Sequence, residues 1–230
     1  MIERPTPVFL VYVAQIVRLF FLDNYMLKAA PKISVITICC NRLEYTARTI
    51  SSVIGAMGDV DYEYLVVDSG SEDGTREWLS YIARLPYFRK IRPIIRQKNT
   101  GMMDAFSQGV VESSSPMLIF TDNDILVHSK DVGKKIIQGG RPYGMSDFIV
   151  RQRNRHTEYV DYPVAFFYMM RQHYVFGMNI PDDYSKHKMK FFVHKDIICE
   201  HIDGADSNQR ASLSKKKYPM SIIYRNKEKV

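Results

Sequence analysis

The chain has 230 residues, 46% of them hydrophobic and 25% charged, which is ordinary for a soluble globular protein and allows one α/β domain with a full core. Its three cysteines include the adjacent pair Cys39 and Cys40; this excludes a disulfide framework and offers no spacing typical of a structural zinc site. The formal net charge of +7 favours anionic partners, such as nucleotides, nucleic acid or acidic lipid surfaces, without choosing among them.

The first predicted element is the apolar segment Pro7–Leu22, within an N-terminal helical segment of residues 1–31. It is too short for a comfortable membrane span of about 20 apolar residues, and it carries Arg18 in its interior. It lacks a basic start and a small-residue cleavage site, so a secretory signal is not expected. We expect a helix packed on the domain first, a helix lying in a membrane interface second and a spanning anchor third.

From Lys32 onward, strands and helices are predicted to alternate. Continuous apolar, β-branched runs, typical of strands buried on both faces of a parallel sheet, occur at Ile33–Cys39, Tyr64–Val67, Ile91–Ile95 and Met117–Thr121. Apolar residues at helical spacing predict a helix after each of the first three strands, the first capped by Asn41 and the third opened by Asn99–Gly101. The alternation predicts right-handed βαβ units and therefore a mainly parallel sheet flanked by helices.

After Gly140 the regular pattern fades. Val164–Met170 is predicted as a strand, and Phe191–His194 and Ile197–Cys199 as two shorter strands. The chain from Asp203 onward is polar and contains a basic run, which predicts a tail or a flap.

Polar side chains follow the predicted strands at the edge where parallel sheets bind ligands, beyond the carboxyl ends of the strands. Asn41 follows the first strand, Asp68 the second, and Asp122 and Asp124 the fourth. Two carboxylates at positions i and i+2 leave a strand on the same side, where their like charges repel unless a cation holds them. Oxygen ligands suit Mg²⁺ or Mn²⁺, so this Asp-x-Asp predicts a divalent metal site.

Two further groups of residues have both a functional and a structural interpretation. Asp68 can accept hydrogen bonds from a base or a ribose, or it can cap the following turn with Ser69 and Ser71. The glycine and free N–H groups of Asn99–Gly101 suit phosphate or ribose oxygens. Asp104, in the first turn of the same helix, has stabilisation of the helix dipole as its structural role. The sequence leaves these alternatives open.

The chain contains, in this order, the motifs ISVITICCNR, YLVVDSGSEDGT, NTGMMDAFSQG and MLIFTDND. Together they resemble the nucleotide-binding half of the family 2 glycosyltransferases, which have the GT-A fold. The resemblance covers roughly Lys32 to Leu126 and departs from the family at Ser69, where a second aspartate is usual. It implies a Rossmann-like, mainly parallel sheet with a nucleotide-sugar-binding half at residues 32–140, a smaller acceptor-binding half at residues 141–205 and a basic tail at residues 206–230.

The resemblance implies an inverting transfer of a sugar from a UDP-, GDP- or dTDP-type donor, with a UDP-sugar as the first expectation. It also implies a Mn²⁺ or Mg²⁺ ion held by Asp122, Asp124 and His201, since His201 matches the family's late histidine better than His194 does. A surface histidine is the alternative for both. The residues expected to contact the nucleotide sugar are Thr37, Asn41, Arg42, Asp68, Asn99, Gly101, Asp104, Asp122 and Asn123.

The family's catalytic base is a carboxylate ahead of the late strand, and the corresponding pair here is Asp182 and Asp183. Asp183 matches the catalytic member best, with a Pro-Asp-Asp turn as the structural alternative. Asp183 would accept the proton of the acceptor hydroxyl as that hydroxyl attacks the sugar.

The expected acceptor is a glycan or a lipid-linked glycan; DNA with a modified base is a second expectation, based on the basic stretch Arg151–Arg155. The protein is expected in the cytoplasm, with peripheral membrane contact through residues 7–22 as an alternative. A dinucleotide-dependent oxidoreductase or a nucleotidyltransferase would need a glycine-rich loop where the chain has Cys39–Arg42. A non-catalytic nucleic-acid-binding module is the remaining rival, although no helix-turn-helix or zinc pattern supports it. The oligomeric state is left open.

Overall fold

The computed structural model describes residues 32–139, 141–148, 159–160, 166–173 and 191–202. The chain divides into two compact units, Met1–Pro31 and Lys32–Val230, and every described residue belongs to the second unit. The expectations for residues 7–22, 151–155 and 206–230 therefore lie outside the described residues.

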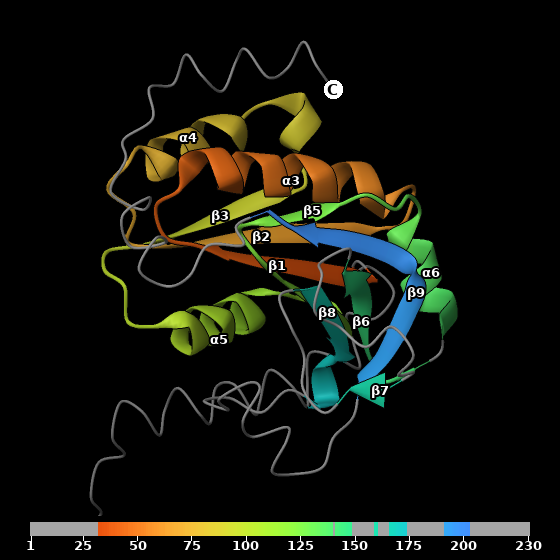
Figure 1. Ribbon diagram of the computed structural model, residues 1–230. Helices are drawn as coiled ribbons and strands as arrows, with labels where there is room; N and C mark the ends of the chain where they lie inside the picture. Colours follow the sequence, from red (N-terminus) through yellow and green to blue (C-terminus); the bar gives the residue numbers. More distant parts are fainter. Residues whose placement is uncertain (1–31, 140, 149–158, 161–165, 174–190, 203–230) are drawn as a thin grey trace, which may run out of the picture. The chain divides into compact units, whose positions relative to one another are not determined.

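Four parallel strands make up the first part of the sheet, as the buried apolar runs predict. They are β1 (Ile33–Cys39), β2 (Tyr62–Ser69), β3 (Ile91–Arg96) and β4 (Met117–Asp122). β1 lies between β2 and β4, and β3 pairs with the far side of β2 (Figure 1). The side chains of β1 are buried from Ile33 to Thr37, because helices cover both faces of the sheet.

The same sheet continues with strands from the second half of the chain, so strands from both sides of residue 140 share it. These strands are β5 (Ile125–Val127), β6 (Tyr143–Phe148), β7 (Tyr159–Val160), β8 (Phe166–Met170) and β9 (Phe191–His201). β8 is antiparallel to β4 and β6, β9 is parallel to β6, and β9 is antiparallel to β5 and β7. Within the described residues the order is β3-β2-β1-β4-β8-β6-β9-β5, with β7 beside β9.

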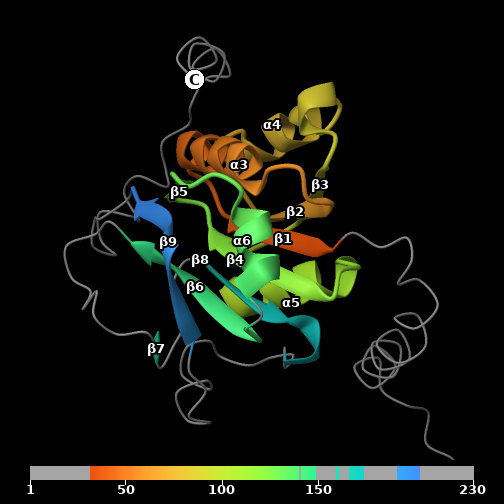
Figure 2. The same cartoon turned by 90° about the vertical axis from the view of Figure 1, so that its right-hand side faces the viewer.

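Helices lie on both faces of the parallel strands. They are α3 (Leu43–Met57), α4 (Thr75–Ile82), α5 (Met102–Glu112) and α6 (Val132–Gly139), with short 3₁₀ turns at η2 (Pro86–Phe88) and η3 (Arg171–His173). α3 and α4 cover one face and α5 the opposite face (Figures 1 and 2), while α6 packs beside α3. None of the helices in the described ranges has the length and apolar character that crossing a membrane requires.

The start of α3 corrects one expectation, because Asn41 does not cap this helix. The capping position is Arg42, whose side chain makes no capping hydrogen bond. The N–H of Leu43 donates instead to Oδ2 of Asp73, 2.9 Å away in the loop after β2. The cap therefore comes from a neighbouring loop, and it holds the loops after β1 and β2 together.

The strand order places the site. Because β1 has β2 on one side and β4 on the other, the order reverses between β1 and β4, and open α/β sheets bind ligands in the crevice beyond the strands at such a point. Ile38 pairs with Asp122 at this edge. The loop after β1 and the turn after β4 therefore lie next to each other.

Arg171, directly after β8, ties the end of α5 to the sheet. Its guanidinium donates to the carbonyl oxygens of Ser115 and Val110, at 2.7 and 2.8 Å, and to the hydroxyl of Ser113 at 2.6 Å. Since each bond to a charged donor contributes about 1.5–3 kcal/mol and its loss leaves acceptors unpaired, Arg171→Met should lower the free energy of unfolding by about 3 kcal/mol. Urea denaturation measures this, with the exposed Arg89→Met as control. Equal midpoints for the two variants would contradict the assignment.

Candidate functional site

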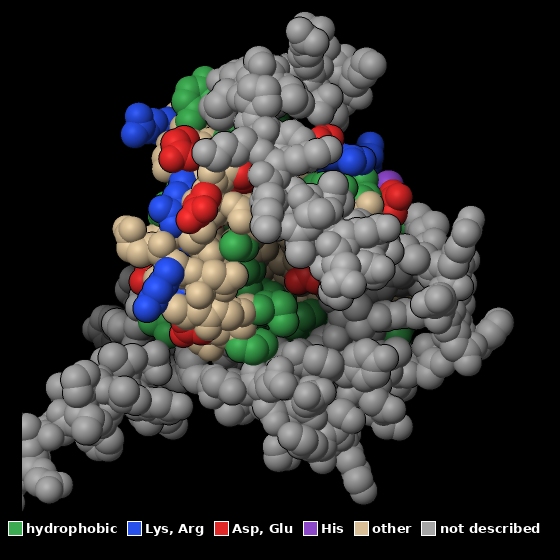
Figure 3. All heavy atoms as spheres, turned by 60° about the vertical axis from the view of Figure 1, so that its left-hand side comes forward, with side chains coloured by type: hydrophobic (Ala, Val, Ile, Leu, Met, Phe, Trp, Pro, Cys, Tyr) green, Lys and Arg blue, Asp and Glu red, His purple; other side chains and the backbone are tan. Residues whose placement is uncertain are grey.

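The carboxyl ends of the parallel strands lie at the left of Figure 1, where the chain enters α3 and α5, and this side comes forward in Figure 3. On that face, basic and acidic side chains alternate along one margin, while hydrophobic side chains gather toward the centre (Figure 3). The described side chains along this margin therefore carry charges of both signs.

The turn after β4 is fixed by contacts to two other elements. The amide of Asn123 donates to the hydroxyl of Thr46 in α3, at 3.0 Å. Asp124 is buried, with its Oδ2 accepting from Nη1 of Arg42 at 3.0 Å and its Oδ1 lying 3.0 Å from Nε2 of His201. Burial opposes the charged form of Asp124, but the neighbouring His201 and Arg42 outweigh it and lower the pKa of this carboxyl below its usual value.

His201 reaches the turn because β9 runs antiparallel to β5. Ile125 pairs with His201, and the N–H of Ile202 donates to the carbonyl oxygen of Asp124 at 2.9 Å. Asp122, Asp124 and His201 each present one ligand atom, and these atoms lie within 4.8 Å of one another. The structure thus brings together the three residues that the sequence predicts as metal ligands.

The residues of this cluster fit a divalent cation. Two carboxylates and one imidazole form a donor set suited to Mn²⁺, and two like charges at this distance favour a bound cation. Oδ1 of Asp124 is buried and faces Nε2 of His201, 3.0 Å away, so both atoms could bind the same cation. The cluster is therefore the place in the described structure where a cation can bind.

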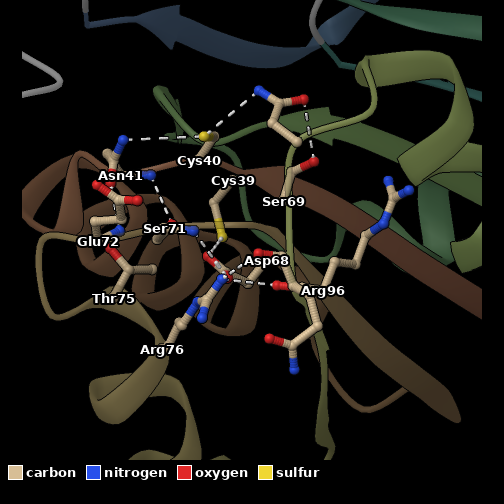
Figure 4. Close-up of polar contacts among 12 residues, drawn as sticks. Cys39, Cys40, Asn41, Asp68, Ser69, Ser71, Glu72, Thr75, Arg76 and Arg96 are labelled. Atoms are coloured by element: carbon tan, nitrogen blue, oxygen red, sulfur yellow. Dashed lines mark hydrogen bonds and ion pairs between the residues drawn. The ribbon is translucent and has the colours of Figure 1, made fainter.

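Asp68, at the end of β2, is fully buried and engaged within the fold (Figure 4). Its Oδ2 accepts from the N–H of Ser71 at 3.1 Å and from Nε of Arg76 at 3.2 Å, and the thiol of Cys39 lies 3.9 Å from Oδ1. Burial and the nearby Asp68 raise the pKa of the Cys39 thiol. The turn-capping interpretation of Asp68 is thus confirmed by its bond to Ser71, and its contact with a nucleotide stays a prediction.

The loops after β1, β2 and β3 are joined by polar contacts, which Figure 4 shows side by side. The backbone N–H of Asn41 donates to the hydroxyl of Ser71 at 2.6 Å. The amide of Asn99 donates toward Sγ of Cys40 at 3.6 Å, and its oxygen accepts from the N–H of Gly101 at 2.8 Å. Asn41, Asn99 and Gly101 therefore lie on one connected rim at the sheet edge, where the sequence predicts nucleotide contacts.

Two other predicted nucleotide residues have structural contacts. Thr37 is fully buried inside β1 and shares a hydrogen bond of 2.8 Å with the hydroxyl of Tyr64, which places it in the core rather than at the edge. Asp104 is exposed in the first turn of α5 and pairs with Arg96. The hydroxyl of Thr100, and then the guanidinium of Arg96, lower the pKa of its carboxyl. The predicted base pair, Asp182 and Asp183, lies outside the described residues.

Sequence reasoning missed two residues that shape this edge. Asp73 is buried and, besides capping α3, accepts from the N–H and the hydroxyl of Thr75, at 3.1 and 2.6 Å. The spacing Asp-x-Thr in a turn-rich loop is a signal for this side-chain turn. Arg76 donates to Asp68 and to the carbonyl oxygen of Arg96, and no local pattern indicates that contact.

His194, the alternative late histidine, does not belong to the three-residue cluster. It is buried, its Nε2 is 2.9 Å from the hydroxyl of Tyr168, and its Nδ1 is 3.7 Å from Asp196. Burial lowers the pKa of His194 below its ordinary value, although Asp196 acts in the opposite direction. The burial of this imidazole therefore favours its neutral form in the folded chain.

This burial predicts a pH dependence of stability. Between the lowered pKa of His194 and its unfolded value of about 6.5, the unfolded state binds more protons. The contribution of His194 is therefore fully present above about pH 6.5 and is lost as the pH falls through the folded pKa. His194→Gln, which keeps an acceptor for Tyr168, should flatten the decline in urea midpoint between about pH 7 and pH 5. A decline as steep as that of the wild type would assign the effect to other groups.

Comparison with known proteins adds three findings. A family model described as glycosyl transferase family 2 matches residues 34–194. An uncharacterized glycosyltransferase of Nostoc sp. is 36% identical over 93 residues, which are 40% of this chain and 28% of that protein. The chain spans only 14–34% of the length of three curated relatives that it matches.

Two solved structures resemble the fold. A mannosyltransferase from Pyrobaculum calidifontis, in complex with GDP-Man and Mn²⁺, matches with a TM-score of 0.64 at 14% identity, over 89% of this chain and 69% of that one. TarS of S. aureus (residues 1–349), in complex with UDP-GlcNAc, matches with a TM-score of 0.57 at 14% identity, over 76% and 61% of the two chains. At these identities the likeness concerns the fold alone.

Proposed function

The chain belongs to glycosyl transferase family 2, and on that premise we propose that it moves a sugar, with inversion, from a nucleoside diphosphate sugar to an acceptor hydroxyl in a metal-dependent reaction. Its fold is the GT-A fold that the sequence resemblance implies. The observation that carries the proposal is the cluster of Asp122, Asp124 and His201 beyond the carboxyl end of β4. The connected rim of Asn41, Asn99 and Gly101 beside it offers polar groups for the nucleotide.

We assign the cation, Mn²⁺ or Mg²⁺, to the three clustered residues. The fold neighbours support the choice of ligands, since one is in complex with GDP-Man and Mn²⁺ and another with UDP-GlcNAc. A UDP-sugar is our proposed donor, with GDP-sugars as the first comparison. When bound, the cation supplies positive charge that neutralises the diphosphate leaving group.

The chain's own residues have separate tasks in this proposal. Asp183 accepts the proton of the acceptor hydroxyl while the hydroxyl oxygen bonds to the anomeric carbon and the bond to the diphosphate oxygen breaks. Attack from the face opposite the leaving group inverts the configuration. Since the proton moves late, an ordinary carboxylate suffices as base. This assignment rests on the sequence resemblance.

The proposed acceptor is a glycan or a lipid-linked glycan, and the proposed compartment is the cytoplasm, where the free thiols of Cys39, Cys40 and Cys199 are stable. DNA as acceptor is the second proposal, based on the net charge of +7. A glycan is placed first by analogy with the family.

A panel of nucleotide sugars tests the donor without knowledge of the acceptor. The chain is mixed with each nucleotide sugar and Mn²⁺, and binding is followed by thermal shift and slow hydrolysis by release of the nucleoside diphosphate. We expect one nucleotide class to raise the melting temperature and to be hydrolysed, and a chelator to remove both effects. Absence of binding across the panel would overturn the proposed function.

A further inference from the structure

The segment between β1 and α3 has an unusual backbone. Asn41 and Arg42 both lie in the left-handed region, with φ of 59° and 63°. Such a conformation costs about 1–3 kcal/mol at a non-glycine residue and persists only where the surroundings enforce it. Here the N–H groups of Asn41 and Leu43 donate to Ser71 and Asp73, so the loop after β2 holds the conformation on both sides of Arg42.

This backbone directs the side chain of Arg42 into the molecule. Its guanidinium is buried, lies 4.3 Å from the ring centre of Tyr45 and bonds to Oδ2 of Asp124 at 3.0 Å. The other oxygen of Asp124 is left on the side of His201. The two oxygens of the Asp124 carboxylate therefore have different partners: Oδ2 bonds to Arg42, and Oδ1 is directed toward the metal cluster.

We propose that Arg42 is a positioning residue, which holds Asp124 so that Oδ1 is aligned with Asp122 and His201 for a divalent cation, instead of contacting the nucleotide as the sequence suggests. The inference rests on the proposed function, because it concerns the same cation site. Residues that hold metal ligands in place typically change metal affinity by 10–100-fold when they are replaced. A nucleotide contact would leave affinity for the metal alone unchanged.

Replacing Arg42 can change the affinity for Mn²⁺ in two opposite ways: it can remove a repelling positive charge, and it can disturb the orientation of Asp124. The choice of substitute separates the two effects. The positive charge of Arg42 repels a cation at the site. An uncharged substitute would therefore raise Mn²⁺ affinity by removing this repulsion while lowering it by misaligning Asp124. Arg42→Lys keeps the charge but replaces the planar fork with a compact ammonium on a different stem. A loss of affinity in Arg42→Lys therefore reports orientation.

The experiment measures binding of Mn²⁺ alone to the full chain by titration calorimetry. We expect the Kd of Arg42→Lys to rise about 10- to 100-fold. Arg48→Lys, at an exposed position of α3, is the matched control and should bind as the wild type does. If Arg42→Lys fails to fold, Tyr45→Leu removes the ring beneath the guanidinium without altering the strained residue, and we expect a smaller loss in the same direction.

Binding of a nucleoside diphosphate in the presence of a chelator gives the second readout. We expect this affinity to be unchanged in Arg42→Lys. The positioning role is overturned if the variant binds Mn²⁺ like the wild type, or if it loses nucleotide affinity equally with and without chelator. If the wild type itself takes up no Mn²⁺, the metal dependence in the proposed function fails as well, so the two failures are distinguishable.

Discussion

Replacing Asp124 by asparagine should abolish binding of Mn²⁺ and lower the transfer rate by about 1000-fold, which corresponds to about 4 kcal/mol of transition-state stabilisation. Asp124 is the buried member of the metal cluster, and its Oδ1 faces Nε2 of His201 at 3.0 Å. Asparagine keeps the shape and an acceptor for Arg42 but removes the negative charge that a cation requires. Calorimetry with Mn²⁺ and donor hydrolysis measure the two effects separately.

The control for this variant is Asp59→Asn, which removes an exposed carboxylate from the loop before β2. It should leave both Mn²⁺ binding and turnover unchanged. The unfolding midpoint of Asp124→Asn is recorded as well, since a buried arginine that has lost its charged partner destabilises the fold. Full activity of Asp124→Asn with a chelator present would refute the metal site.

Replacing Asp183 by asparagine should lower transfer by a factor of about 10²–10⁴, the range expected when a general base is lost. Donor affinity should be unchanged, because the base acts on the acceptor hydroxyl and not on the nucleotide. The measurement compares the turnover number for transfer with the Kd for donor and Mn²⁺. An amide cannot accept the proton, so the effect falls on the chemical step.

Asp182→Asn is the matched control, since it makes the same chemical change one residue away. If Asp183 is the base, Asp182→Asn should transfer at close to the wild-type rate. A severe loss in Asp182→Asn together with an unchanged rate in Asp183→Asn would move the base to the neighbouring residue. Unchanged rates in both would place the base elsewhere in the chain.

The parallel half of the fold could be predicted because its signals are local. β1 is found with the predicted bounds, since Ile33–Cys39 is one apolar, β-branched run buried on both faces. The strands of the other half mix parallel and antiparallel pairs. The sequence does not predict β5, β6 or β7, and β9 is one strand, Phe191–His201, where the sequence predicts two. Its pairing with β6 shifts at Ser146/Asp147, and such a bulge interrupts the alternation that a pattern requires.

In the site, too, residues with a local sequence signal could be predicted and contacts set by tertiary packing could not. The sequence could place Asp122 and Asp124 at a strand end, and the family pattern could single out His201. The contact between Arg42 and Asp124 depends on two left-handed residues and on a loop from another strand. Thr37 was expected at the nucleotide, and its burial against Tyr64 follows from the register of β1 with β2. Contacts of this kind are fixed by tertiary packing and leave no local signal.

The pairing of β5 with β9 covers three residue pairs, from Ile125 with His201 to Val127 with Cys199. Side chains alternate between the faces of a sheet, so a slip of a single residue would turn the imidazole to the opposite face and bring Glu200 opposite Ile125. The register of this three-pair ladder therefore decides whether His201 lies beside Asp122 and Asp124.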